Sequence, residues 1–113
     1  MSPRARGTLI LLGSLLVGLV AMFVAVHSTG GGHGSYFLAK ALFPFTMLSA
    51  SPSTGLPAWA LAVALLQFPA YGAALASGTL RGSIGRAALL VGAVHLLAAL
   101  VAFFVVPNDA FPN

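Results

Sequence analysis

The chain has 113 residues, of which 59% are hydrophobic and 5% are charged, whereas soluble domains carry roughly 25% charged residues. Such a chain cannot cover itself with a hydrated surface, so we expect a single integral membrane domain over residues 1–113. The absence of cysteine excludes disulfides, thiolate nucleophiles and cysteine-ligated metals. With Asp109 as the one acidic residue, catalysis by paired carboxylates is excluded, and the basic residues are too scattered for a nucleic-acid-binding stripe.

The first apolar run covers residues 8–27, and about 20 helical residues are enough to cross the ~30 Å hydrocarbon core of a bilayer. The run could alternatively be a secretory signal peptide, because basic residues like Arg4 and Arg6 also precede the apolar region of such peptides. That region has about 7–15 residues and ends at a small-residue cleavage site, and neither property is found here. We therefore predict an uncleaved transmembrane helix.

A glycine-rich loop then leads to apolar residues 36–50, which Lys40 and Pro44 interrupt. A segment of this length is too short for an ordinary transmembrane helix, so we predict a short interfacial or re-entrant helix. If residues 36–50 crossed the membrane instead, the fold would be a four-helix bundle, and the sequence leaves this alternative open.

Two further apolar runs, residues 58–77 and 86–106, are long enough to span the membrane. Pro69 lies inside the first of them and removes one backbone donor, and Pro107 ends the second. The predicted fold is all-α: a polytopic membrane helical bundle with three transmembrane helices at about 8–27, 58–77 and 86–106.

The basic residues predict the orientation, because cytoplasmic loops retain an excess of lysine and arginine. With the N-terminus in the cytoplasm and three spans, all the arginines lie on the cytoplasmic side, and Lys40 and Asp109 lie on the other. These arginines are Arg4, Arg6, Arg81 and Arg86. The alanine-, glycine- and leucine-rich composition, with arginine preferred over lysine, indicates a bacterial source, and we expect a multi-pass protein of the inner membrane.

Gln67 and His95 are strongly polar side chains that lie about ten residues from the ends of their predicted spans, near the middle of the membrane. Because an unpaired polar group in hydrocarbon costs several kcal/mol, each should face the bundle or a water-filled cavity. We predict that the two are packed inside the protein and interact, as a structural polar pair. A proton relay or a ligand site is the other interpretation.

Small residues recur four positions apart in the predicted spans, a spacing that lets helices approach closely in a membrane. The pairs are Ser14 and Gly18, Ala21 and Ala25, Ala70 and Ala74, Ala88 and Gly92, and Ala98 and Ala102. Taken together, they predict a packed bundle.

We expect no catalytic residues, no cofactor and no metal. Two histidines that bind one haem as an axial pair must lie at a similar depth, but His27 ends the first span and His95 lies in the middle of the last, an offset on the order of 14 Å at 1.5 Å per residue. One chain therefore cannot hold a haem between them, and the pairing of His95 with its symmetry mate in a dimer is the alternative. His27, His33 and Asp109 could gather on one side of the membrane, but they lack the regular spacing of a zinc site.

These features favour a small non-enzymatic inner-membrane protein that acts through helix contacts with a partner membrane protein or with lipid, as an accessory subunit does. The alternative is a homo-oligomeric small channel or transporter in which Gln67 and His95 line the path.

Overall fold

A computed structural model describes residues 1–30, 34–49 and 56–107 and confirms the all-helical fold. The described chain forms five helices: α1 (Pro3–Thr29), α2 (Phe37–Leu42), α3 (Pro44–Leu48), α4 (Ala58–Leu80) and α5 (Ile84–Val105). Of these, α1, α4 and α5 are long and apolar enough to cross a membrane. The prediction of three transmembrane helices is therefore confirmed.

The first span begins earlier than its apolar run because the chain carries helix-starting signals before it. Ser2 is the N-cap, and its hydroxyl oxygen accepts a 3.1 Å hydrogen bond from the backbone N–H of Ala5. Pro3 occupies the first helical position, where the missing N–H costs nothing. The helix ends at Gly30, whose φ of 55° suits a residue without a Cβ.

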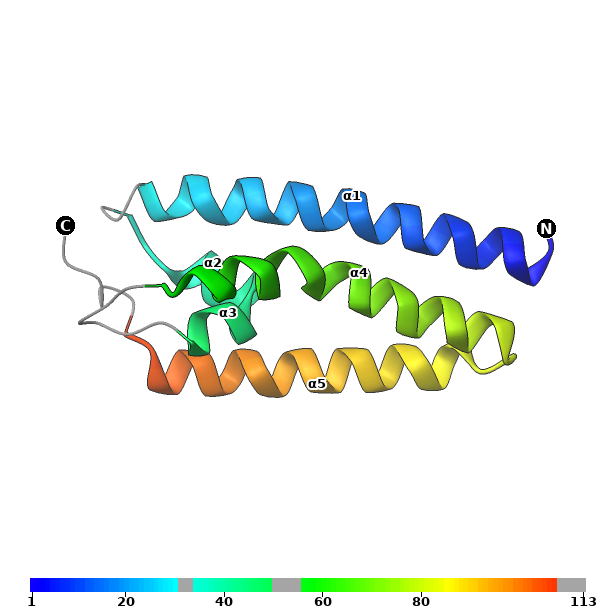
Figure 1. The fold of residues 1–113 in the computed structure, drawn as a ribbon. Helices are drawn as coiled ribbons and strands as arrows, with labels where there is room; N and C mark the ends of the chain where they lie inside the picture. Colours follow the sequence, from blue (N-terminus) through cyan, green and yellow to red (C-terminus); the bar gives the residue numbers. More distant parts are fainter. Residues whose placement is uncertain (31–33, 50–55, 108–113) are drawn as a thin grey trace.

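The three spans are packed one beside the next, with α4 between α1 and α5 (Figure 1). Small residues allow α1 and α4 to approach each other closely. A Cβ atom added to Gly72 would lie 2.6 Å from the Cβ of Ser14, and one added to Gly18 would lie 3.0 Å from the Cβ of Phe68. Part of the predicted small-residue spacing thus serves the contact between α1 and α4.

The four arginines all belong to one end of the bundle, which we call the basic end. It holds the start of α1 and the connection between α4 and α5 (Figure 1). The opposite end, called the far end, holds the end of α1, the start of α4 and the end of α5. All four arginines therefore lie at the same end of the bundle, as the three-span topology predicts.

Helices α2 and α3 lie in the half of the bundle near the far end, between α1 and α5 (Figure 1). They have six and five residues, too few to cross a membrane. The chain enters the bundle along α2, turns at Phe43 and Pro44, and comes back along α3, where the Thr46 hydroxyl reaches the Ala60 carbonyl oxygen near the start of α4. We call α2 and α3 the re-entrant pair.

Most buried side chains of the three spans are small, and most of the large apolar side chains of these spans face outward. The core packs alanines of α1, α2 and α4 around Phe43 and Met47 of the re-entrant pair. Large apolar side chains of all three spans are exposed, and most of them are leucines and valines. In water this distribution would be unfavourable, but lipid is as apolar as leucine and rewards close helix packing instead.

Candidate functional site

The polar residues near the middle of the bundle surround the turn between α2 and α3. Gln67 of α4 is 5% exposed, and its side-chain Nε2 donates a 2.7 Å hydrogen bond to the carbonyl oxygen of Leu42. Its Oε1 is buried and has no hydrogen-bond partner within the described residues. The amide orientation is fixed by the carbonyl, because a carbonyl oxygen can only accept.

His95 of α5 is half-buried, and its ring hydrogen-bonds the carbonyl of Ala41, the residue before Leu42. Its Nε2 lies 2.7 Å from the carbonyl oxygen of Ala41, and its Nδ1 lies 2.8 Å from the hydroxyl oxygen of Tyr71. Since the carbonyl only accepts, the neutral ring carries its proton on Nε2 and accepts from the Tyr71 hydroxyl at Nδ1. The two rings meet edge to face, with centroids 5.6 Å apart.

The carbonyl groups of Ala41 and Leu42 need these donors because the helix stops beside them. Phe43 has φ −130° and ψ 59°, outside the helical range, and Pro44 has no N–H to offer. Carbonyls at the end of a helix have no partner within it, and at membrane depth water is not available to bind them. Side chains of α4 and α5 supply the missing hydrogen bonds.

The structure thus brings Gln67 and His95 to one place, although their hydrogen bonds in the described chain do not join the two side chains directly. They bind the carbonyls of consecutive residues from two different spans. The link between them is the short stretch of backbone from the Ala41 carbonyl to the Leu42 carbonyl, at the end of α2. Sequence position indicated their depth but gave no sign of these acceptors.

Lys40 is a third polar group of the site. From sequence, it counts as an interruption of the apolar run and as a charge for the orientation, but not as a residue of this site. It is 2% exposed, and its Nζ donates a 2.7 Å hydrogen bond to the carbonyl oxygen of Val106, the C-cap of α5. The same ammonium group lies 4.8 Å from the centroid of the Phe103 ring, a distance that suits a cation–π contact. The lysine therefore ties α2 to the end of α5.

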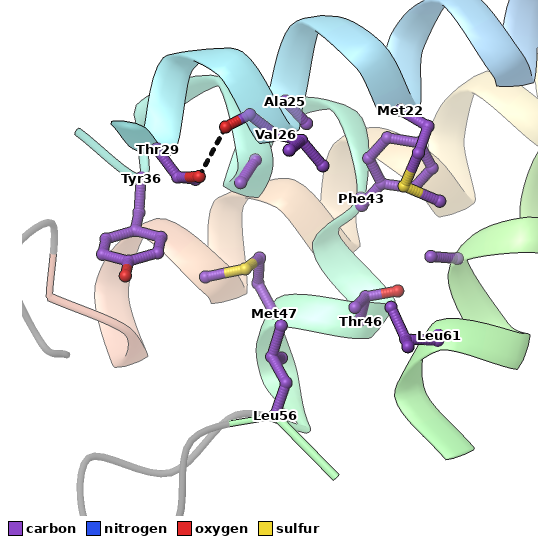
Figure 2. Close-up of a pocket in the computed structure, with 12 residues that line it drawn as sticks. Met22, Ala25, Val26, Thr29, Tyr36, Phe43, Thr46, Met47, Leu56 and Leu61 are labelled. Atoms are coloured by element: carbon purple, nitrogen blue, oxygen red, sulfur yellow. Dashed lines mark hydrogen bonds between the residues drawn. The ribbon is translucent and has the colours of Figure 1, made fainter. Parts of the chain in front are cut away.

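An apolar cavity of about 210 Å³ lies between α1, the re-entrant pair and α4. Figure 2 shows the side chains of Met22, Tyr36, Phe43 and Met47 among those that line it. The Thr29 hydroxyl at its edge donates to the Val26 carbonyl of its own helix, so it does not offer its proton to the cavity. This cavity offers volume for an apolar group but little polar recognition.

The histidines considered for metal binding are not assembled by the described chain. His27 lies at the end of α1, where its Nδ1 is 3.1 Å from the Phe23 carbonyl oxygen of the same helix. His33 and Asp109 lie outside the described residues. Within residues 1–30, 34–49 and 56–107, no three histidine, cysteine or acidic side chains come together as a metal site would require.

Comparisons of the chain with protein-family models, with curated proteins and with solved structures find no match.

Proposed function

We propose that this chain is a small non-enzymatic membrane protein that acts through helix contacts with a partner membrane protein or with lipid, as an accessory subunit. We place it in the inner membrane of a bacterium, with the basic end and the N-terminus in the cytoplasm. The orientation is supported by the arginines at the basic end, since positive residues are retained on the cytoplasmic side.

One observation carries this proposal: His95 and Gln67 donate hydrogen bonds to the backbone carbonyl oxygens of Ala41 and Leu42. Irregular backbone at membrane depth occurs either where it is buried in protein or where it lines a water-filled cavity. Channels and transporters use the second arrangement, in which free carbonyls or helix ends face the transported species. Here Gln67 and His95 donate to carbonyl oxygens of the protein's own backbone, which supports a structural role for these two residues.

The surface that we assign to the partner is the basic-end half of α5, on the face that contains Ala88 and Gly92. Both residues are exposed, and a Cβ added to Gly92 would meet no described atom within 4 Å. The small pair Ala98 and Ala102, farther along the same helix, is buried. The pair Ala88 and Gly92 therefore keeps the close-packing spacing that another helix could use.

Photo-crosslinking in native membranes tests this assignment. A photoreactive residue at Gly92 should cross-link to one discrete membrane protein, and the same residue at Leu97, an exposed position facing lipid, should not. Gly92→Leu should also reduce co-purification of that protein, whereas Leu97→Ala should leave it unchanged.

The same experiment distinguishes the accessory role from the alternative, a homo-oligomeric channel or transporter. Cross-links from Gly92 only to other copies of the chain, together with ion flux by the purified protein in liposomes, would overturn the accessory role. If His95→Leu then abolished that flux, the ion path would be assigned to the polar residues near the middle of the bundle, Gln67 and His95.

A further inference from the structure

A groove of about 460 Å³ lies between α4 and α5 at the basic end, remote from the re-entrant pair. Polar and charged side chains form one part of its wall and small or apolar side chains form the other. The polar part consists of Ser77, Arg81, Ser83 and Arg86. The apolar part includes Ala74, Ala87, Leu90 and Val91.

The two arginines of this groove have no counter-charge in the described chain. Neither guanidinium group of Arg81 and Arg86 makes a hydrogen bond or an ion pair with residues 1–30, 34–49 or 56–107. The one acidic residue of the sequence, Asp109, follows α5, whereas these arginines precede or begin it. Within the part of the chain that the structure describes, the groove therefore presents two positive charges without a counter-charge.

The two serine hydroxyls of the groove also have no hydrogen-bond partner among the described residues. Every other serine and threonine of the described chain makes a side-chain hydrogen bond to backbone. Ser77 and Ser83 make none with the described residues. A serine within a helix, such as Ser77, can donate to a carbonyl of the preceding turn. Since neither hydroxyl has a partner among the described residues, both can donate to another molecule.

The first turn of α5 adds backbone donors to the same place. Gly82 has a φ of 69° and allows the tight connection in which the Ser83 N–H donates to the Gly78 carbonyl oxygen at 2.7 Å. Ser83 is the N-cap of α5, and its side chain does not cap the helix. The first backbone N–H groups of α5 thus have no side-chain acceptor.

We propose that this groove binds a phosphate group, that of an anionic membrane phospholipid. Guanidinium groups, hydroxyls and a helix N-terminus are all hydrogen-bond donors that suit phosphate oxygens. Basic pockets between transmembrane helices on the cytoplasmic side are the places where anionic headgroups bind.

The apolar wall favours a lipid over a free phosphate ion. Ala70, Ala74, Ser77 and Arg81 follow one another at intervals of three or four residues, so they share one face of α4. Ala70 lines the next hollow along that face, beside Val63 and Leu66. An acyl chain can lie along this row of small residues while its phosphate stays at the arginines.

This assignment rests on the proposed cytoplasmic placement of the basic end but not on partner contact at Gly92. The test uses the purified full chain in mild detergent, with native mass spectrometry to measure bound lipid. Phosphatidylglycerol is the anionic probe, phosphatidylcholine is the zwitterionic comparison, and inorganic phosphate is the competitor.

We expect phosphatidylglycerol to bind in preference to phosphatidylcholine and to resist displacement by equimolar inorganic phosphate. Each of Arg81→Gln and Arg86→Gln should weaken binding by about fivefold, which corresponds to the ~1 kcal/mol of a basic residue near an anionic surface. Ser77→Leu should also weaken it, since it fills the groove without changing a charge. The double variant Arg4→Gln, Arg6→Gln should bind normally, because these exposed arginines belong to the same end but do not line the groove.

Equal loss in the Arg4 and Arg6 control, or unchanged binding in Ser77→Leu, would overturn the site, since binding would then follow overall charge. Displacement by equimolar inorganic phosphate would overturn its assignment to a lipid. Arg81 and Arg86 are both exposed, so the fold should survive their replacement, and circular dichroism of each variant verifies this. These outcomes are independent of cross-linking at Gly92, which tests the accessory role alone.

Discussion

Lys40 donates through its ammonium group to the carbonyl oxygen of Val106, and this 2.7 Å hydrogen bond connects residues that lie 66 positions apart in the sequence. It closes the far end of the bundle by joining the re-entrant pair to the last span. A buried charge in a membrane protein is costly unless it finds such a partner. The lysine, which interrupts the apolar run of residues 36–50, thus anchors α2 to the end of α5.

Replacement of this lysine should destabilise the protein even though it removes a buried charge. Lys40→Met keeps most of the side-chain volume but leaves the buried Val106 carbonyl without its donor. A hydrogen bond to a charged group is worth about 1.5–3 kcal/mol, and we expect a loss in that range. Unfolding in mixed micelles of increasing dodecyl sulfate content measures it.

Arg4→Met is the matched control, because it removes an exposed charge from the opposite end of the bundle. A surface change of this kind should alter stability by about 0.5 kcal/mol or less. If Lys40→Met were equally silent, the contact with Val106 would contribute nothing to the fold.

Close packing of α1 against α4 predicts opposite effects for two glycine substitutions. A Cβ at Gly72 would collide with Ser14, so Gly72→Ala should cost about 1–3 kcal/mol of stability through overpacking. Gly13→Ala places its methyl group in open space and should be neutral or stabilising by up to ~1 kcal/mol, since alanine favours helix. Mixed-micelle unfolding again gives both values, and equal effects would contradict the close approach of the two helices.

The spans could be predicted from sequence because length and hydropathy decide them almost alone. Gln67 and His95 could be found as well, since strongly polar side chains in the middle of a span are rare. Their acceptors could not be found, because every residue has a carbonyl and only the break at Phe43 and Pro44 leaves those of Ala41 and Leu42 free. That selection depends on tertiary placement of the re-entrant pair.

At the basic end, too, the sequence predicted the general property of the residues but not the site that they form. Arg81 and Arg86 predicted orientation from sequence, through the general preference of positive residues for the cytoplasm. The groove that they share with Ser77 depends on how α4 and α5 pack near their connection. No spacing in the sequence distinguishes the hydroxyl of Ser77, which has no partner among the described residues, from the hydroxyl of Thr79, which donates to a carbonyl of its own helix.

Cysteine labelling should place the two ends of the re-entrant pair on one side of the membrane. The chain has no cysteine of its own, so Ser35→Cys, Leu56→Cys and Gly85→Cys each provide a single thiol at an exposed position. An impermeant maleimide should reach the first two from the periplasm and the third only after permeabilisation. Labelling of Ser35→Cys and Leu56→Cys from opposite sides would establish a fourth crossing instead.

The last prediction concerns the cooperation of Gln67 and His95 through the turn that both hold. Hydrogen bonds between helices in membranes are worth about 0.6 kcal/mol on average and up to ~1.7 kcal/mol. Gln67→Leu and His95→Leu should therefore each lower stability modestly without unfolding the bundle. Loss of one donor lets the turn shift, so the second hydrogen bond should contribute less once the first is absent.

A double-mutant cycle in mixed-micelle unfolding measures this coupling, which we expect to be at least ~0.5 kcal/mol, as found for residues in one network. The control cycle pairs Gln67→Leu with Thr79→Val, whose hydroxyl bonds only the Leu75 carbonyl of its own helix, and it should be additive. Additivity for Gln67 and His95 as well would show that the consecutive carbonyls are held independently. If His95→Leu instead abolished an activity while stability stayed intact, the imidazole would serve a proton or ligand path, and its contact with Ala41 would be secondary.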